Sequence, residues 1–426
     1  MLLGGPLRFT AALLVIGTAF AVAVASSAEL VALYFAGHAS AAAGSEALAS
    51  AAWTSPLNWQ YPYRRATVLA AVGRHREARA AFEKALVLNP ACATCSVAIA
   101  DLAARAGEDP SPWLDRARAH GRSSTRVRME AGILSARLGR DDAAAADFRA
   151  ALLGHRRRPE ALFETFHSAY DDAFVLERIV PDELLERYLA FARRRLALDS
   201  VRAVWARSYA VGVGDRARAV YAEYLLGHGL VDEAWRARFG PSAATTGGIL
   251  NGGFERGEDL APFGWRIGSA EGVDAGIHHC KDCRQGGRAL RLRFDGEHNP
   301  GYFRTVQLVP VEPGGRYALD AHVRADRLTS ASGPLLMVVG ANGGDGSPIT
   351  DCKLRAASEA FLATSDWRPV TIEFEVPIAC RGVRVLVARP ATERLNQLIG
   401  GELWVDDVRL EKLPGAERAS GSTAGT

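Results

Sequence analysis

The fold of the first half of the chain is decided by residues 59–90, which read WQYPYRRATVLAAVGRHREARAAFEKALVLNP. Small residues stand at fixed offsets in this stretch, with Ala66 and Ala85 in two apolar faces and Gly73 between them. Pro90 ends the stretch, because proline cannot continue a helix. Small side chains let two antiparallel helices approach closely, so the pattern predicts a helical hairpin.

The same pattern recurs further along the chain. Gly73, Gly107 and Gly139 are separated by 34 and then by 32 residues. In the second unit, Pro110 and Pro112 are expected to interrupt the second helix. A period of about 34 residues is typical of stacked helical pairs.

These features resemble the tetratricopeptide repeat family. The resemblance implies an all-α helical repeat solenoid over residues 45–240, with residues 229–235 forming the turn of a degenerate last pair. Such solenoids bind peptides or other proteins along a concave face, so a protein partner is expected here. The alternative is a spacer that only holds the rest of the chain away from a membrane.

A long uncharged stretch stands near the amino terminus. Residues 9–28 carry no charge, and the apolar run resumes after Glu29. About 18 such residues are enough to cross a bilayer as a helix. We therefore expect residues 9–36 to be a transmembrane anchor or a signal sequence, and a cleavage site among the small residues before Glu29 keeps the second option open.

The charges beside this stretch favour one orientation. Arg8 precedes it, and no further Lys or Arg follows until Arg64. Because cationic residues stay on the cytoplasmic side, residues 1–8 are expected to be a cytoplasmic tail. The expected location is a bacterial-type inner membrane, crossed once, with the bulk of the chain on the periplasmic or extracellular side.

Composition excludes two broad classes of protein. Hydrophobic residues make up 48% of the 426 residues, too many for a mostly disordered chain. Lys and Arg number 51 against 48 Asp and Glu, a net charge of +3. This near-balance argues against a general polyanion binder, so no nucleic-acid partner is expected.

The six cysteines suit an exported protein, since an even number is compatible with disulfides in an oxidising compartment. We predict a bond between Cys352 and Cys380, which flank strands of the second half. Pairing of either with Cys280 or Cys283 remains open, because sequence does not fix connectivity. The neighbouring His278-His279 leaves a zinc site open as a further alternative.

The composition changes after residue 240. Residues 241–248 are a linker by composition, and residues 414–426 are expected to be a disordered tail. Between them lie eight or nine short runs of alternating hydrophobicity, which predict an all-β sandwich over residues 249–413. The runs are 249–255, 265–268, 289–294, 302–311, 316–325, 335–340, 368–376, 383–388 and 403–410.

The order of motifs in this segment is similar to that of family 4/9 carbohydrate-binding modules, which are jelly rolls of the galactose-binding-like type. The motifs are Asn251-Gly252-Gly253-Phe254-Glu255, Gly264-Trp265, Pro313-Gly314-Gly315-Arg316-Tyr317, Trp367-Arg368-Pro369-Val370 and Leu403-Trp404-Val405-Asp406-Asp407. The resemblance implies a jelly-roll β-sandwich and a possible polysaccharide ligand.

The same resemblance implies a structural calcium site. In such modules an acidic residue on the first strand lies beside one on the last strand, and Glu255 with Asp406 or Asp407 match these places. Calcium prefers six to eight oxygen ligands, which carboxylates and carbonyls supply. The alternative is that these acidic residues only end strands or face solvent.

Sugar binding needs an aromatic ring for the apolar face of the sugar and polar groups for its hydroxyls. Tyr302 and Arg304, on one strand, and Trp404, near the end of another, are the candidate carbohydrate-binding residues. Trp265 and Trp367 stand where the resemblance implies core packing.

No catalytic motif accompanies these features, so we expect no enzyme and no catalytic cofactor. The sequence predicts a membrane-anchored envelope protein whose repeats dock a protein partner and whose sandwich binds a glycan, in polysaccharide assembly or export. The alternatives are a purely structural protein-interaction adaptor and an accessory subunit of a glycoside hydrolase.

Overall fold

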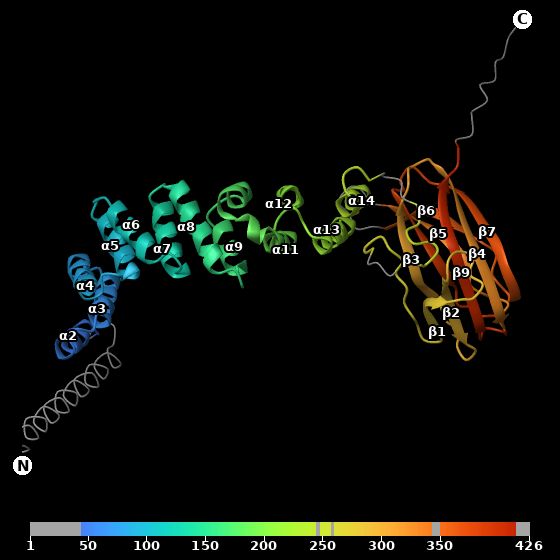
Figure 1. Ribbon diagram of the computed structural model, residues 1–426, viewed down its shortest axis with the longest axis horizontal. Coiled ribbons are helices and arrows are strands. Elements are labelled where there is room, and N and C mark those ends of the chain that lie inside the picture. Colours follow the sequence, from blue (N-terminus) through green and yellow to red (C-terminus); the bar gives the residue numbers. More distant parts are fainter. Residues whose placement is uncertain (1–43, 244–247, 257–259, 343–349, 415–426) are drawn as a thin grey trace, which may run out of the picture. The chain divides into compact units, whose positions relative to one another are not determined.

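A computed structural model of the protein describes residues 44–243, 248–256, 260–342 and 350–414 (Figure 1). The chain forms two compact units, Met1–Val211 and Gly212–Thr426. The first is helical, and the second joins a helical hairpin to a β-sandwich. The boundary therefore falls before the last helical pair, whereas the sequence placed all helices up to residue 240 together.

Some predictions fall outside the described residues. They concern the span 9–36, the cytoplasmic tail 1–8, half of the linker 241–248 and nearly all of the tail 414–426. Within the described ranges, no helix combines the length and hydrophobicity needed to cross a membrane.

The first unit is built mainly from helical hairpins, as the sequence predicts. The segment quoted at the outset folds into α3 (Gln60–Ala71) and α4 (His75–Leu88), which pack against each other. The other elements are α2 (Gly44–Thr54), α5 (Ala93–Arg105), α6 (Ser111–His120), α7 (Thr125–Arg137), α8 (Asp141–Gly154), α9 (Glu160–His167), α10 (Asp172–Phe174), the π-helix η1 (Val175–Ile179), the 3-10 helix η2 (Asp182–Leu184), α11 (Leu185–Arg195) and α12 (Leu198–Val211).

The recurring glycines have the role that their spacing indicates. Gly73, Gly107 and Gly139 each adopt a left-handed backbone, with φ of +80°, +77° and +68°, directly after the first helix of a pair. Glycine adopts this conformation without steric cost. At a helix crossing, a Cβ on Gly132 would lie 2.5 Å from the Phe148 ring, so α7 and α8 need the absence of a side chain there.

One detail of the helical pattern is wrong in the sequence analysis. Pro110 and Pro112 do not interrupt a helix, because α6 begins at Ser111 with Pro110 before it and Pro112 in its first turn. Proline is well suited to these positions, where its missing N–H would have no intrahelical acceptor.

The second unit begins with the hairpin of α13 (Asp215–Gly227) and α14 (Val231–Phe239). Trp235 and Phe239 of α14 pack on Phe263, with ring centroids 5.0 and 6.0 Å apart from it. The buried Arg238 donates from Nε to the Ala261 carbonyl at 2.8 Å. Aromatic packing and a buried hydrogen bond thus fix the hairpin to the segment that leads into the sandwich.

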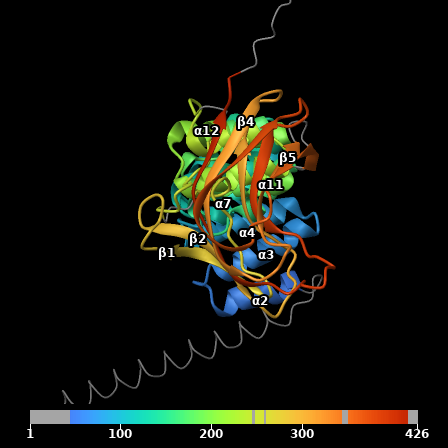
Figure 2. The same cartoon turned by 90° about the vertical axis from the view of Figure 1, so that its right-hand side faces the viewer.

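The sandwich consists of two antiparallel sheets. One has the order β1-β2-β9-β4-β7 and the other β3-β8-β5-β6, so that β1 lies at the edge of its sheet beside β2 (Figure 2). The strands are β1 (Val273–His279), β2 (Arg288–Asp295), β3 (Tyr302–Pro310), β4 (Arg316–Leu328), β5 (Leu335–Asn342), β6 (Thr350–Ala357), β7 (Ala363–Glu375), β8 (Gly382–Arg389) and β9 (Gly400–Lys412).

The predicted all-β sandwich is present, but two of the predicted strands do not form and two strands form that were not predicted. Residues 249–255 and 265–268 are not strands, apart from an isolated bridge between Arg266 and Val306. The first stretch is a turn, in which Asn251 and Phe254 have positive φ. Strands β1 and β6 were not predicted.

The core of the sandwich lies between the sheets. Alternate residues of the central strands are fully buried there, including Leu292 of β2, Val338 of β5 and Val405 of β9. Burying each such side chain stabilises the fold by about 1.5–3 kcal/mol.

All six cysteines form disulfides, including the predicted bond between Cys352 and Cys380. The other two join Cys92 to Cys95 and Cys280 to Cys283. The bond between Cys352 and Cys380 passes closely over Gly340 of β5, where a Cβ would lie 2.3 Å from the Cys352 sulfur.

Candidate functional site

The three residues predicted to bind carbohydrate do not converge. Tyr302 is fully buried, and its hydroxyl donates to the Gly268 carbonyl at 2.9 Å and lies 2.6 Å from the Thr305 hydroxyl. Its ring therefore belongs to the core, and the prediction that it contacts a sugar is corrected. Burial also raises its pKa, an effect that the Thr305 hydrogen bond opposes.

Arg304 and Trp404 lie on different sheets. Arg304 is exposed on β3 and donates to the Ser269 carbonyl at 3.2 Å. A register shift separates Tyr302 from Thr305, so Tyr302 and Arg304 do not share one regular strand face. Trp404 is on β9 of the other sheet.

Trp404 is covered by arginines. Its ring is 8% exposed, with the guanidiniums of Arg291 and Arg324 at 5.8 and 5.0 Å from its centroid. Arg324 also lies 5.2 Å from the Trp367 ring. Since cation–π contacts of this kind occupy the aromatic faces, Trp404 is not free to stack on a sugar.

Two of the acidic residues predicted to bind calcium, Glu255 and Asp406, accept hydrogen bonds from the backbone of the same loop. Oε1 of Glu255 accepts the amides of Gly287 and Arg288 at 2.8 and 2.7 Å. Oδ2 of Asp406 accepts the amides of Arg284 and Gln285 at 2.8 and 2.9 Å. Two carboxylates, one before the sandwich strands and one on the last strand, thus hold residues 284–288 between β1 and β2.

Asp406 is fully buried, and its other oxygen, Oδ1, accepts the Asp407 amide at 2.7 Å. Burial raises its pKa, an effect that these amide hydrogen bonds oppose. Asp407 itself contacts other partners, since Arg409 lies 2.8 Å and His322 3.4 Å from its carboxylate oxygens.

As they lie, these residues do not fit a calcium site. Both oxygens of Asp406 already accept N–H groups, whereas calcium requires six to eight oxygen ligands. In the described part of the chain, no group of three His, Cys, Asp or Glu side chains is placed to hold a metal ion. A calcium ion would therefore require these groups to rearrange.

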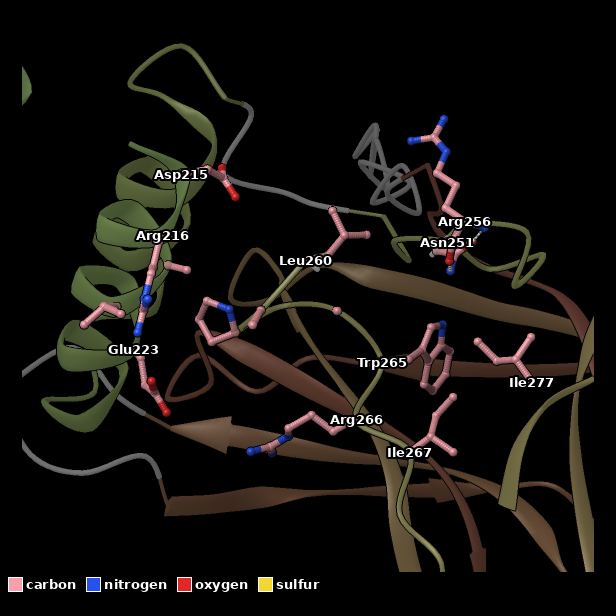
Figure 3. A pocket seen from close by; sticks show the side chains of 15 residues that line it. Asp215, Arg216, Glu223, Asn251, Arg256, Leu260, Trp265, Arg266, Ile267 and Ile277 are labelled. Carbon is pink, nitrogen blue, oxygen red and sulfur yellow. Dashed lines mark hydrogen bonds between the residues drawn. The ribbon is translucent and has the colours of Figure 1, made fainter. Parts of the chain in front are cut away.

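The second unit contains a large cleft that the sequence analysis did not anticipate. It has a volume of about 800 Å³ and lies between α13 and the segment that leads into the sandwich (Figure 3). Its apolar side comprises Trp265, Ile267 and Ile277, and Leu260 and Pro262 also line it.

Polar groups face the same cleft. Asp215, Arg216 and Glu223 come from α13, and Asn251, Arg256 and Arg266 come from the opposite segment. Asn251 is held by two hydrogen bonds of 3.0 Å with the backbone of Arg256. Arg266 is fixed by reciprocal backbone bonds of 2.9 Å with Val306 of β3.

Trp265 gives the cleft its aromatic surface. Its ring is half-buried against the sandwich core and lies 5.5 Å from the Phe254 ring. Its indole N–H is buried and makes no hydrogen bond within the described residues. The expected packing role is therefore present, and the residue also lines the cleft.

The first unit carries a separate groove of about 310 Å³ on α3, α5 and α7. Its lining includes Tyr63, Ala98 and Ile133, the last of which is 44% exposed. Asp101 stands at its edge, 2.8 Å from Arg105 and 2.5 Å from Arg137. Burial raises the Asp101 pKa, but the two arginines outweigh this and hold it below its usual value.

No protein-family model and no curated protein matches this chain. Parts of it are similar to solved structures. The match to a structure of MamA covers 31% of this chain and 79% of the MamA chain, with 14% identity and a TM-score of 0.27. A family 4 carbohydrate-binding module covers 39% and 99%, with 18% identity and a TM-score of 0.27.

A third solved structure is the CBM22-1 xylan-binding domain from Paenibacillus barcinonensis Xyn10C. It covers 41% of this chain and 100% of its own, with 15% identity and a TM-score of 0.26. The predicted fusion of tetratricopeptide-like helical pairs to a two-sheet sandwich is confirmed by the architecture described above.

Proposed function

We propose that this chain is a non-catalytic binding protein of the cell envelope, in which the second unit binds a glycan and the first docks a protein partner. The observation that carries the proposal is the cleft beside Trp265, which combines an apolar wall with polar groups from two sides. Binding sites for small ligands generally have this composition and volumes of about 300–1,000 Å³.

A sugar suits this composition better than a purely apolar ligand does. The axial C–H groups of a sugar ring pack on an aromatic surface such as Trp265, while its hydroxyls need donors and acceptors. Asn251 and Glu223 offer acceptors, and Arg256 and Arg266 offer donors. The proposed site therefore does not include Tyr302, which is buried in the core, or Trp404, whose ring is covered by arginines.

The groove of the first unit supports the protein-docking part of the proposal. Exposed apolar side chains such as Ile133 lie beside charged residues on the first helices of three consecutive pairs. An extended or helical peptide with apolar anchors fits such a surface.

The location is part of the same proposal. Three disulfides suit an oxidising compartment, and the apolar stretch 9–36 would anchor the chain there or direct its export. A role in polysaccharide assembly or export would need both binding sites on the outer side of one membrane.

A glycan array probed with the full-length chain tests the glycan-binding part. Binding to at least one oligosaccharide is expected, and Trp265→Phe should weaken it by about tenfold, since stacking area is lost. The matched control is Trp404→Phe, whose ring is covered by arginines and should leave binding unchanged. Absence of binding to every glycan would leave the adaptor alternative.

Site-specific photocrosslinking tests the docking part. A photoreactive residue at Ile133 in the groove should give one discrete adduct in envelope preparations. The control position is Val87 of α4, which is 80% exposed and does not line the groove. Equal crosslinking from both positions would contradict a specific partner in the groove.

A further inference from the structure

The charges around the Trp265 cleft are unequal once internal ion pairs are counted. Its lining contains three arginines, Arg216, Arg256 and Arg266, and two acidic residues, Asp215 and Glu223. Asp215 is already neutralised, because both of its oxygens accept hydrogen bonds from the buried Arg238, one of them at 3.0 Å. Glu223 is therefore the one lining carboxylate among the described residues that no described arginine pairs.

The three lining arginines share one feature, the lack of an acidic partner among the described residues. Within the described ranges, none of Arg216, Arg256 and Arg266 has a carboxylate at ion-pair distance, whereas more than a dozen other arginines do. Guanidiniums that line a cavity without a carboxylate partner can bind an anionic ligand.

The arrangement gives each charged group a separate position (Figure 3). Arg266 extends from the sandwich segment toward α13, which carries Arg216 and Glu223, and Arg256 lies near Asn251 at another part of the cleft. The Arg266 backbone is anchored to β3 at both N–H and C=O, so its side chain starts from a fixed point. With the backbone held, only the side-chain torsions of Arg266 have to be ordered when a ligand binds.

We propose that the cleft binds an acidic glycan, with uronate carboxylates held by Arg266 and Arg216 and a sugar ring against Trp265. This deepens the proposed function and rests on it. The guanidinium fork matches the two oxygens of a carboxylate, which supplies specificity as well as charge. The unpaired Glu223 accepts sugar hydroxyls, and its negative charge limits how many carboxylates the cleft tolerates.

The proposal is compatible with the near-neutral charge of the whole chain. A general polyanion binder carries its excess of basic residues over a large surface, whereas here three arginines line one cavity that also has an aromatic wall. The cleft is therefore expected to discriminate a uronate-containing sugar from a simple polyanion.

Isothermal titration calorimetry with the full-length chain tests the proposal. The probes are oligogalacturonate, an alginate oligomer and glucuronoxylan, and the neutral counterparts are xylo- and cello-oligosaccharides of similar length. Methyl-esterified oligogalacturonate is the closest control, because it keeps the sugar ring and removes the charge. At least one uronate probe should bind about tenfold or more tightly than any neutral one, since charged hydrogen bonds contribute that much.

Variants locate the effect. Arg266→Gln and Arg216→Gln should each weaken uronate binding by about tenfold, a larger loss than they cause for any neutral sugar. Arg293→Gln on β2, which is exposed and does not line the cleft, is the matched control and should have no effect. Raising the salt concentration should weaken uronate binding in the unaltered chain, because the interaction is screened.

The outcomes separate this inference from the proposed function. If the uronate probes bind no more tightly than their neutral and esterified counterparts, the acidic-glycan inference is overturned but glycan binding is left intact. Tighter binding of dextran sulfate than of every uronate would also overturn it, because a sulfate ester would then be the recognised group. Failure of all sugars to bind would overturn both.

Discussion

The two units bury charge in different ways. The helical unit buries Asp147 of α8, whose side chain is 2% exposed, and surrounds it with Arg118 and Arg128 at 2.8 Å each. The sandwich buries Arg389 of β8 completely and gives it no carboxylate at all among the described residues.

Neutral oxygens replace the missing counter-ion of Arg389. Its guanidinium donates to the carbonyls of Ser332, Pro300 and Gln397 at 3.1, 2.7 and 2.8 Å, and to the side-chain oxygen of Asn299 at 3.0 Å. Burial nevertheless lowers its pKa from the usual value. Three loops at one end of the sandwich are thereby joined through one side chain.

The difference follows from where backbone groups are available. Inside a helical hairpin the carbonyls and amides already bond within each helix, so a buried charge must find an opposite charge on another side chain. Loops at the end of a sandwich have unpaired carbonyls and amides, which can solvate an ion directly. Asp406, held by backbone amides, is the anionic counterpart of Arg389 in the same unit.

The largest effect is expected from removing Arg389. Arg389→Met should destabilise the second unit by about 3 kcal/mol or more, because several buried oxygens lose their donor at once. Urea unfolding of the full chain, followed by limited proteolysis to assign each transition to a unit, measures this. The exposed Arg293→Met is the control, and a loss below about 1 kcal/mol for Arg389→Met would contradict the role of the buried guanidinium.

A smaller effect is expected for Asp147. Asp147→Asn should destabilise the first unit by about 2–3 kcal/mol, below the usual cost of breaking a fully buried pair. The side chains of Arg118 and Arg128 are 25% and 16% exposed, so water can hydrate them once the carboxylate is gone. The same unfolding assay checks this, with Asp199→Asn on α12, where the side chain is 92% exposed, expected to change little.

If Asp147→Asn cost more than Arg389→Met, the comparison would be reversed. Replacing a buried charge would then cost more stability where an opposite charge pairs with it than where loop carbonyls accept its hydrogen bonds. Measuring both variants in one chain makes the two units internal references for each other.

The helical unit was the easier part to predict, because its signals are local. Turn glycines such as Gly73 and small crossing residues such as Gly132 act within one hairpin, and their spacing is visible along the chain. The prolines were misread because a proline within a helix and a proline at its start look alike in sequence. Pro112 stands in the first turn of α6, where it favours the helix.

The sandwich and its site depend on distant contacts, which alternation does not reveal. Tyr302 has the aromatic ring and hydroxyl typical of a sugar-binding residue, but its hydroxyl forms hydrogen bonds with Gly268 and Thr305 inside the core. Arg389 looks like an ordinary polar residue in a strand, and Asp406 was expected to bind calcium, not backbone amides. The cleft lies between α13 and the segment around Trp265, and no sequence pattern indicates that these two stretches are close in space.

A third prediction concerns the loop held by Asp406. Asp406→Asn should destabilise the second unit by about 1–3 kcal/mol, because an amide NH₂ would face backbone N–H groups in place of one acceptor oxygen. Gly286→Ala should act on the same loop, since a Cβ there would lie 2.3 Å from Glu255 Cδ. Hydrogen exchange at residues 284–288 measures the loosening, and unchanged protection in both variants would contradict the clamp.

The smallest effect is expected from calcium. An ion bound at a hundredfold excess over its dissociation constant would add about 2.7 kcal/mol of stability, enough to raise the unfolding midpoint by several degrees. We expect no such rise for the full chain in calcium compared with chelator. The lone pairs that would ligate an ion are used otherwise, since Asp406 accepts three amides and Asp407 lies beside Arg409 and His322. A rise of several degrees that Asp406→Asn abolishes would show that the loop rearranges around an ion, and the contrast between solvation by backbone and by opposite charge would then no longer hold for this carboxylate.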